Sequence, residues 1–184
     1  MGSFGGRGME LEVGLARTLH LDGHSGVIRQ AAEEVDVEGG GVRQLVQDLI
    51  ATMSKEGGTG IAAPQIGVSQ RLVVYRISKE RAEKEGVVEV PITALANPVL
   101  TPIRPEEMEE GWEACLSVPG QRGMVPRYKA IHYKGFNLIS NQQEQGEVSG
   151  FHARLLQHEV DHLDGILYTD KMTLAEPWQR EDPK

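Results

Sequence analysis

The sequence contains a single cysteine, Cys115, among its 184 residues. One cysteine cannot form an internal disulfide and is typical of a reducing compartment, so a cytoplasmic protein is expected. No apolar run approaches the length needed to cross a membrane. Basic residues are also scarce: the chain has 19 Lys and Arg against 27 Asp and Glu, so its net charge is −8. This acidic balance argues against nucleic-acid binding. The length suits one domain with its own core.

The ends of the chain differ in composition from its centre. Residues 1–18 begin Met-Gly-Ser-Phe-Gly-Gly-Arg-Gly and are expected to be a flexible leader, either left from expression or serving as a targeting segment. In the second case, an organelle would replace the cytoplasm as the location. Residues 19–176 are expected to form a single catalytic domain, followed by a short polar tail at 177–184.

The segment His158-Glu159-Val160-Asp161-His162 carries the strongest chemical signal. Two histidines four residues apart lie on one face of a helix, where both imidazoles can reach one divalent metal. Glu159 can then take a proton from a water activated there. Ser149 and Gly165 are expected to mark the two ends of this helix. Two satisfied core histidines are the alternative interpretation, and Asp161 and Asp164 are expected to make hydrogen bonds or salt bridges.

Cys115 is a candidate third ligand. It stands in Gly111-Trp-Glu-Ala-Cys-Leu-Ser-Val-Pro-Gly120, where apolar neighbours bury the segment and Gly and Pro bracket it with turns. An inert buried thiol is one alternative. A Cys-His nucleophilic pair is another, which would leave Glu159 and the second histidine of the motif without roles. His132 and His152 are expected not to be ligands.

A glycine-rich segment, residues 57–67, follows a predicted amphipathic helix at 41–56. It lacks the Gly-Lys-Ser/Thr ending of a phosphate-binding loop. Gly60 suits the close approach of another backbone, and Gln65 offers an amide that could donate to a developing oxyanion. A plain connector between helix and strand is the alternative.

The remaining pattern predicts an α+β fold, with small antiparallel sheets packed around a central metal-binding helix. Strands are expected at 71–78, 92–103 and 128–134, with 92–103 near a sheet edge because Pro98 and Pro102 interrupt it. Residues 78–86 are expected to be a solvated loop or short helix, 104–110 an acidic loop, and 135–146 a polar hairpin turn.

Three segments, in this order, resemble the peptide deformylase family: Gly58-Thr-Gly-Ile-Ala-Ala-Pro-Gln65, Glu113-Ala-Cys-Leu-Ser117 and Gln157-His-Glu-Val-Asp-His162. The resemblance implies a metal-dependent hydrolase that removes the formyl group from an amino-terminal formylmethionine and releases formate. The residues that it implies for the chemistry are the metal ligands Cys115, His158 and His162, the general acid/base Glu159, and the oxyanion donors Gln65 and the Leu116 backbone N–H.

The resemblance also implies a substrate site. Gly60 would pair with the substrate backbone, and Ile61, Leu116 and Leu155 would line the methionine pocket. Arg122 would hold a loop of the site in place. One departure bears on fit: Ala114 stands where the family usually has glycine, so its methyl group would narrow the site or require a negative φ.

The resemblance implies Fe²⁺ as the working metal, with Zn²⁺, Ni²⁺ or Co²⁺ as substitutes, and a thiolate with two imidazoles suits such ions. The implied partners are N-formylmethionyl peptides of nascent chains, with transient ribosome contact left open and neither nucleic acid nor membrane bound. Two other functions remain open from the residues alone: a His-Glu-x-x-His metalloprotease and a non-catalytic metal-binding protein.

Overall fold

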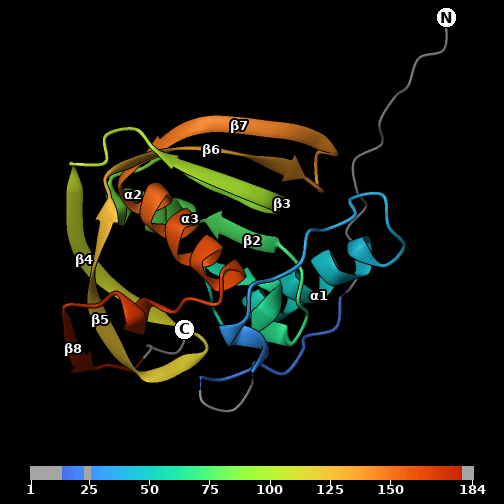
Figure 1. The fold of residues 1–184 in the computed structure, drawn as a ribbon, viewed down its shortest axis with the longest axis horizontal. Coiled ribbons are helices and arrows are strands. Elements are labelled where there is room, and N and C mark those ends of the chain that lie inside the picture. The colour runs from blue at the N-terminus through green and yellow to red at the C-terminus, as the bar shows by residue number, and fades with distance from the viewer. Residues whose placement is uncertain (1–13, 23–25, 180–184) are drawn as a thin grey trace, which may run out of the picture.

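The computed structural model describes residues 14–22 and 26–179 and has a central helix, α3 (Gly150–Leu163), between two antiparallel sheets. Figure 1 shows α3 with the larger sheet on one side and the smaller one on the other. The predicted α+β architecture with small antiparallel sheets is confirmed. The central place of α3 matters because this helix carries both motif histidines.

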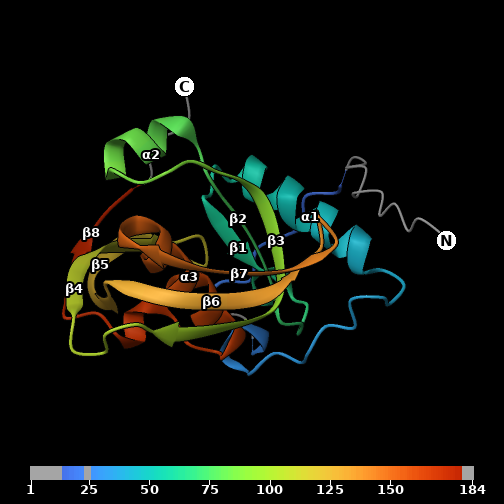
Figure 2. The same cartoon turned by 90° about the horizontal axis from the view of Figure 1, so that it is seen from above.

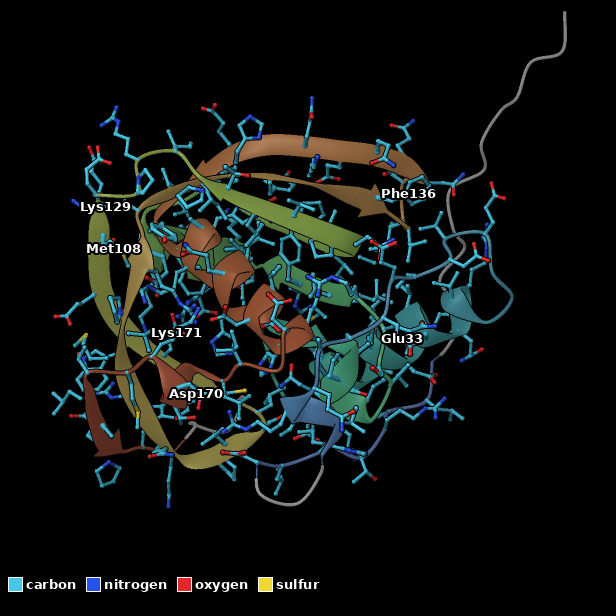
Figure 3. All side chains as sticks on the ribbon, viewed as in Figure 1. Glu33, Met108, Lys129, Phe136, Asp170 and Lys171 are labelled. Carbon is cyan, nitrogen blue, oxygen red and sulfur yellow. The ribbon has the colours of Figure 1, made fainter. Side chains whose placement is uncertain are left out.

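The larger sheet has five strands in the order β1-β2-β3-β6-β7. Their bounds are β1 Gly60–Ala62, β2 Leu72–Ile77, β3 Val90–Pro102, β6 Ala130–Asn137 and β7 Gln142–Ser149. The smaller sheet has the order β4-β5-β8, with β4 Met108–Cys115, β5 Val118–Tyr128 and β8 Leu174–Pro177. In Figure 3, Met108 lies near the start of β4, whereas Phe136 lies far from it near the end of β6.

Two further helices flank this arrangement: α1 (Val42–Lys55) and the short α2 (Lys79–Glu85). Three 3₁₀ turns complete the elements: η1 Val27–Arg29, η2 Ala63–Ile66 and η3 Tyr168–Asp170. None of the helices in the described ranges combines the length and apolar character that crossing a bilayer requires.

Helix α1 forms because its apolar residues recur on one face, and that face packs on β1 and β2. Its buried side chains join those of the sheet in one core cluster, which includes Leu45, Leu49, Met53, Leu72 and Val74. A second cluster packs Leu155, Leu156 and Leu163 of α3 against the same sheet, which fixes the axis of the motif helix.

The ends of α3 agree with the predicted signals. Ser149 occupies the N-cap position, although its side chain makes no capping hydrogen bond. Gly165 follows the last turn with φ +72°, a left-handed conformation that glycine adopts without the strain of a Cβ. The predicted helix at 41–56 is confirmed as α1, and residues 79–85 take the helical alternative, with Ser78 as the N-cap.

Three predictions about the strands and their connections were wrong in detail. The strand predicted near an edge, β3, lies in the middle of the five-stranded sheet. The sheet tolerates Pro98 because it lies within a register shift between Ala96 and Val99, where the ladder is interrupted. The predicted turn at 135–146 is shorter, because β6 and β7 remain paired as far as Asn137 and Gln142. The acidic loop also ends earlier, since β4 begins at Met108.

The expected boundaries of the leader and tail also change. Residues 1–13 and 180–184 lie outside the described residues. Arg17, expected in a flexible leader, donates its backbone N–H to Thr52 Oγ1 at 2.8 Å on α1. At the other end, the Trp178 backbone N–H donates to the carbonyl of Gly120 at 3.0 Å, so the ordered domain continues past residue 176.

Asp48 anchors the amino-terminal segment on α1. Its fully buried carboxylate accepts hydrogen bonds from the Leu15 backbone N–H at 3.0 Å, Arg17 Nε at 2.7 Å and Gln44 Nε2 at 2.9 Å. Burial alone would raise the pKa of Asp48, but these hydrogen bonds and the Arg17 charge outweigh burial and hold the pKa below its usual 3.8.

We therefore expect Asp48→Asn to lower the free energy of unfolding at pH 7 by about 1–3 kcal/mol, measured by urea denaturation. A carboxylate with a lowered folded-state pKa stabilises the fold above its unfolded pKa and loses this effect as the pH falls through the folded value. The difference between wild type and variant should therefore shrink below about pH 4. Asp36→Asn, at an exposed turn, is the control; a pH-independent difference for Asp48→Asn would contradict the assignment.

Candidate metal centre

Three potential metal donors converge between α3 and the end of β4. The sulfur of Cys115 and one ring nitrogen each of His158 and His162 all lie within 4.8 Å of one another. The helix places the two imidazoles one turn apart, with ring centroids 5.1 Å from each other. The last residue of β4 adds the thiol, whose sulfur lies 3.3 Å from His162 Nε2. All three residues are largely buried.

The donor set fits a divalent metal ion. A tetrahedral ion about 2.0–2.3 Å from each donor requires donors roughly 3–4 Å apart. The Cys115–His162 distance of 3.3 Å lies in this range, and all three donors lie within 4.8 Å of one another. Burial holds the pKa of His162 well below 6.5, so its ring is neutral and keeps a lone pair for a metal. Within the described residues this cluster supplies three protein ligands, the number typical of a catalytic site that leaves a further position for water.

Glu113 of β4 fixes the orientation of His158. Its Oε2 lies 2.8 Å from His158 Nδ1, which leaves the Nε2 atom of His158 for a metal. The carboxylate also accepts two hydrogen bonds from buried Arg127, both 2.9 Å long, and one from Arg154 at 2.9 Å. Burial alone would raise the pKa of Glu113, but Arg127 and His158 hold it far below its usual range, so Glu113 stays ionised.

The same arginine ties this network to α3. Arg127 donates to Asp161 Oδ2 at 2.5 Å, and Lys171 Nζ donates to the other oxygen of Asp161 at 2.8 Å. Figure 3 shows Asp170 and Lys171 on the segment that connects α3 to β8. The salt bridges expected of Asp161 and Asp164 are thus present, since Asp164 pairs with Arg71 at 2.7 Å.

Glu159 is buried beside the donor cluster, and its Oε2 has no hydrogen-bond partner among the described residues. Burial raises its pKa to about 7. Its carboxylate lies against β1: a Cβ built on Gly60 would lie 2.4 Å from Glu159 Oε1. Glycine is therefore required at position 60 to leave room for this carboxylate, in addition to any contact with a ligand.

The Gln65 amide has a fixed orientation. Its Oε1 accepts the Ala62 backbone N–H at 2.9 Å, so its Nε2 points toward Cys115 Sγ at 3.5 Å and Ser117 Oγ at 3.2 Å. The amide N–H group thus faces the metal centre, where a developing negative charge would be stabilised.

A cavity of about 870 Å³ opens beside the donor cluster, within the range typical of ligand sites. Its walls come from both sheets, α2 and α3. Of the residues expected in the chemistry and substrate site, the walls include Gly60, Gln65, Cys115, Leu116, Arg122, Leu155, His158 and Glu159. Ile61 does not line it; its side chain is fully buried in the core cluster with α1.

The structure also refines the expectations for Ala114 and Arg122. Ala114 lines the cavity and is not among the described non-glycine residues with positive φ, so its methyl group narrows the cavity without backbone strain. Arg122 pairs with Glu176 of β8 and stacks over the Trp112 ring at 4.4 Å. It therefore links β8 to the wall of the cavity.

Sequence reasoning gave no role to several of these residues. Glu113 lies within the cysteine motif, yet only the fold reveals its contact with His158. A signal for Arg127 was available: it is a basic residue at an inward position of a mostly apolar strand, where burial requires charged partners. The contribution of α2 and Trp178 to the cavity carried no signal in the sequence.

Comparison with known proteins points to one family. The model of the polypeptide deformylase family matches residues 17–178. Peptide deformylase 1 of Bordetella pertussis is 47% identical over 131 residues, which cover 71% of this chain and 73% of that protein. Peptide deformylase 2 of Pseudomonas syringae pv. tomato is 50% identical over 130 residues, 70% of each chain.

Solved structures of peptide deformylases have a similar fold. A Met-Ala-Ser-bound class I type b peptide deformylase from Acinetobacter baumannii has a TM-score of 0.76 at 30% identity, covering 87% of this chain and 100% of that one. The peptide deformylase from Thermus thermophilus has a TM-score of 0.70 at 37% identity, covering 84% of both chains.

We expect Gly60→Ala to reduce turnover strongly, because the new Cβ would displace the Glu159 carboxylate. A misplacement of about 1 Å in a reacting group can cost around 100-fold in rate. Metal content, measured by elemental analysis, should stay normal, since the three atoms nearest to the new Cβ all belong to Glu159 and none to a metal donor. Gly40→Ala is the control because its Cβ would meet nothing within 4 Å. Unchanged turnover in Gly60→Ala would contradict the packing argument.

We expect Glu113→Gln to weaken Zn²⁺ affinity about 10- to 100-fold, because the neutral amide no longer orients and polarises His158 as the carboxylate does. Competition with a coloured chelator would measure this affinity. Glu109→Gln changes an exposed residue of the same strand and should leave affinity unaltered. Equal affinity in both variants would mean that Glu113 does not support the metal centre.

Proposed function

Because this chain belongs to the peptide deformylase family and removes the formyl group from the amino-terminal methionine of new polypeptides, we propose that Cys115, His158 and His162 hold its divalent metal ion and that Glu159 transfers the proton of the hydrolysis. The family match confirms the resemblance drawn from the three motifs. The observation that carries the proposal is the convergence of these three donors, in a cavity, beside the buried Glu159 carboxylate, whose Oε2 has no hydrogen-bond partner among the described residues.

Family membership decides between the functions left open by the residues alone. The chain is an amide hydrolase in protein synthesis, so neither a general metalloprotease nor a non-catalytic metal protein is needed to account for the motif helix. The metal supplies Lewis-acid chemistry when bound: it polarises a carbonyl and lowers the pKa of a coordinated water. The remaining steps depend on side chains of this chain.

Glu159 is suited to move the proton. Its Oε2 is buried without a partner, and its pKa of about 7 lets the same group accept a proton from water and return it to the leaving amine. We assign Gln65 Nε2 and the Leu116 backbone N–H to the oxyanion. The amide orientation set by Ala62 supports the Gln65 part of this assignment.

The cavity offers a place for formylmethionine. Leu155 and Leu116 supply apolar lining next to His158 and Glu159, so we place the methionine side chain against them. Ile61 of β1 is fully buried in the core cluster against which Leu116 packs. Gly60 lies at the free edge of the larger sheet, where an extended peptide backbone can add as a strand. The related Acinetobacter enzyme with bound Met-Ala-Ser is consistent with such a peptide.

We propose Fe²⁺ as the working ion, with Zn²⁺, Ni²⁺ or Co²⁺ as substitutes. A thiolate with two imidazoles is compatible with each of them. A cytoplasmic location and transient contact with the ribosome stay predictions of the same kind, with nascent formylated chains as the partner.

The first experiment measures formate release from formyl-Met-Ala-Ser by the protein loaded anaerobically with Fe²⁺. We expect release from this peptide and none from acetyl-Met-Ala-Ser, whose larger acyl group would have to occupy the site narrowed by Ala114. Release by metal-free protein would overturn the proposed metal centre. No release by fully loaded protein would overturn the proposed function.

We expect Glu159→Gln to keep its metal but to lose about 100- to 10,000-fold in kcat, because the amide cannot accept the proton. Metal content by elemental analysis separates this outcome from loss of the site. Glu147→Gln, at a carboxylate that is 68% exposed on β7, is the matched control. Near-normal kcat in Glu159→Gln would remove Glu159 from the proposed role.

A further inference from the structure

The short helix α2 contributes charged side chains to the cavity. Arg81, Lys84 and Glu85 line it together with residues of β4, β5 and α3. Figure 2 shows α2 at the periphery of the molecule, on the connection between β2 and β3 and away from the body of both sheets. The cavity is therefore lined in part by a peripheral helix, whereas the potential metal donors come from β4 and α3.

The lining of this cavity has a charge balance opposite to that of the whole protein. Its basic residues are Arg81, Lys84, Arg122 and Arg154, and its acidic residues are Glu85, Glu113 and Glu159. The chain as a whole carries a net charge of −8. A positively biased cleft in an acidic protein attracts negative groups selectively to that cleft.

Most of these charges already have partners. Arg154 donates to Glu113, Arg122 pairs with Glu176, and Arg81 pairs with Glu85 at 3.0 Å. Lys84 is exposed and makes no ion pair with any residue in the described ranges. Of the basic residues that line the cavity, Lys84 is therefore the one whose charge is available to a ligand.

Arg81 is held in position next to it. Its guanidinium lies 4.5 Å from the centroid of the Phe151 ring, and its Nε is buried without a hydrogen-bond partner among the described residues. The pairing with Glu85 uses Nη2, so Arg81 keeps unused donors at the cavity wall. We call Arg81 and Lys84 the basic rim.

We infer that the basic rim selects substrates that carry an acidic side chain shortly after the formylmethionine. This inference rests on the proposed function. A formylated amino terminus is neutral, so a nascent chain brings no charge of its own to the metal end, and the first charges that it presents are side chains further along. A carboxylate near Lys84 and Arg81 would gain two cationic partners, whereas a lysine there would be repelled.

The geometry of an extended peptide makes this inference more specific. Side chains of a strand alternate between its two faces, so of two neighbouring substrate positions only one faces α2. The preference for an acidic residue should therefore appear at the second or the third residue of the substrate, but not equally at both.

The test compares kcat/KM for two series of amidated peptides, formyl-Met-Xaa-Ala-Ser-amide and formyl-Met-Ala-Xaa-Ser-amide, with Xaa as Glu, Gln or Lys. Amidation removes the terminal carboxylate, which would otherwise mimic an acidic side chain. We expect the Fe²⁺-loaded enzyme to prefer Glu over Lys by roughly 2- to 10-fold at one of the two positions, because partly exposed ion pairs have effects of this size. About 0.5 M NaCl should bring that ratio close to one.

Lys84→Glu should abolish or invert the ratio of Glu to Lys. Lys79→Glu changes the same charge on the same helix at a residue that does not line the cavity, and it should keep the wild-type ratio. If Lys84→Glu does not fold, Lys84→Gln and the salt dependence of the wild type provide the same comparison.

The outcomes separate this inference from the proposed function. Hydrolysis of all peptides at equal rates, or equal ratios in Lys84→Glu and Lys79→Glu, would overturn the selective role of the basic rim while leaving the deformylase in place. Hydrolysis of none of the peptides would overturn the proposed function itself.

Discussion

The buried ion network centred on Arg127 is the interaction on which the site depends. It joins Glu113 of β4 to Asp161 of α3, and through Glu113 it reaches His158. A buried charge destabilises the fold unless it is paired. Removing one partner of a buried ion pair typically lowers the stability by about 3–5 kcal/mol. The network therefore fixes the smaller sheet to the motif helix in a single arrangement. That arrangement sets the distance between the Cys115 thiol and the two imidazoles.

The site also combines two opposite electrostatic environments, one at Glu113, which contacts His158, and one at Glu159, the next residue of α3. Glu113 has charged donors on several sides and stays ionised, whereas the Oε2 atom of buried Glu159 has no hydrogen-bond partner in the part of the chain that the structure describes, and burial raises the pKa of this group. One carboxylate thus serves as a fixed charge that orients a ligand, and the other as a group that can exchange a proton. The difference arises from the neighbours alone, because both are glutamates buried to a similar extent.

Different parts of the cavity wall are also suited to different roles. Part of its lining comes from α3, β1 and β4, which carry or contact the metal donors and Glu159, and another part comes from the short peripheral helix α2. Residues in the core are constrained by packing, whereas residues on a peripheral connection can change without disturbing the chemistry. Selectivity for the distal part of a substrate is therefore best carried by α2.

The sequence by itself determined the local elements and the identity of the chemistry. The spacing of His158 and His162 implies a shared helical face, and the apolar periodicity of residues 42–53 implies α1, because both depend only on positions near each other in the chain. The motif around these two histidines, together with the segments 58–65 and 113–117, also carried the family resemblance. What the sequence could not determine were relationships between distant segments: the central position of β3, the docking of Arg17 on Asp48, and the burial of Ile61 away from the cavity. Tertiary structure decided these, as it decided that Lys84 lies at the cavity, since strand order and the packing of one element on another depend on contacts that no local pattern records.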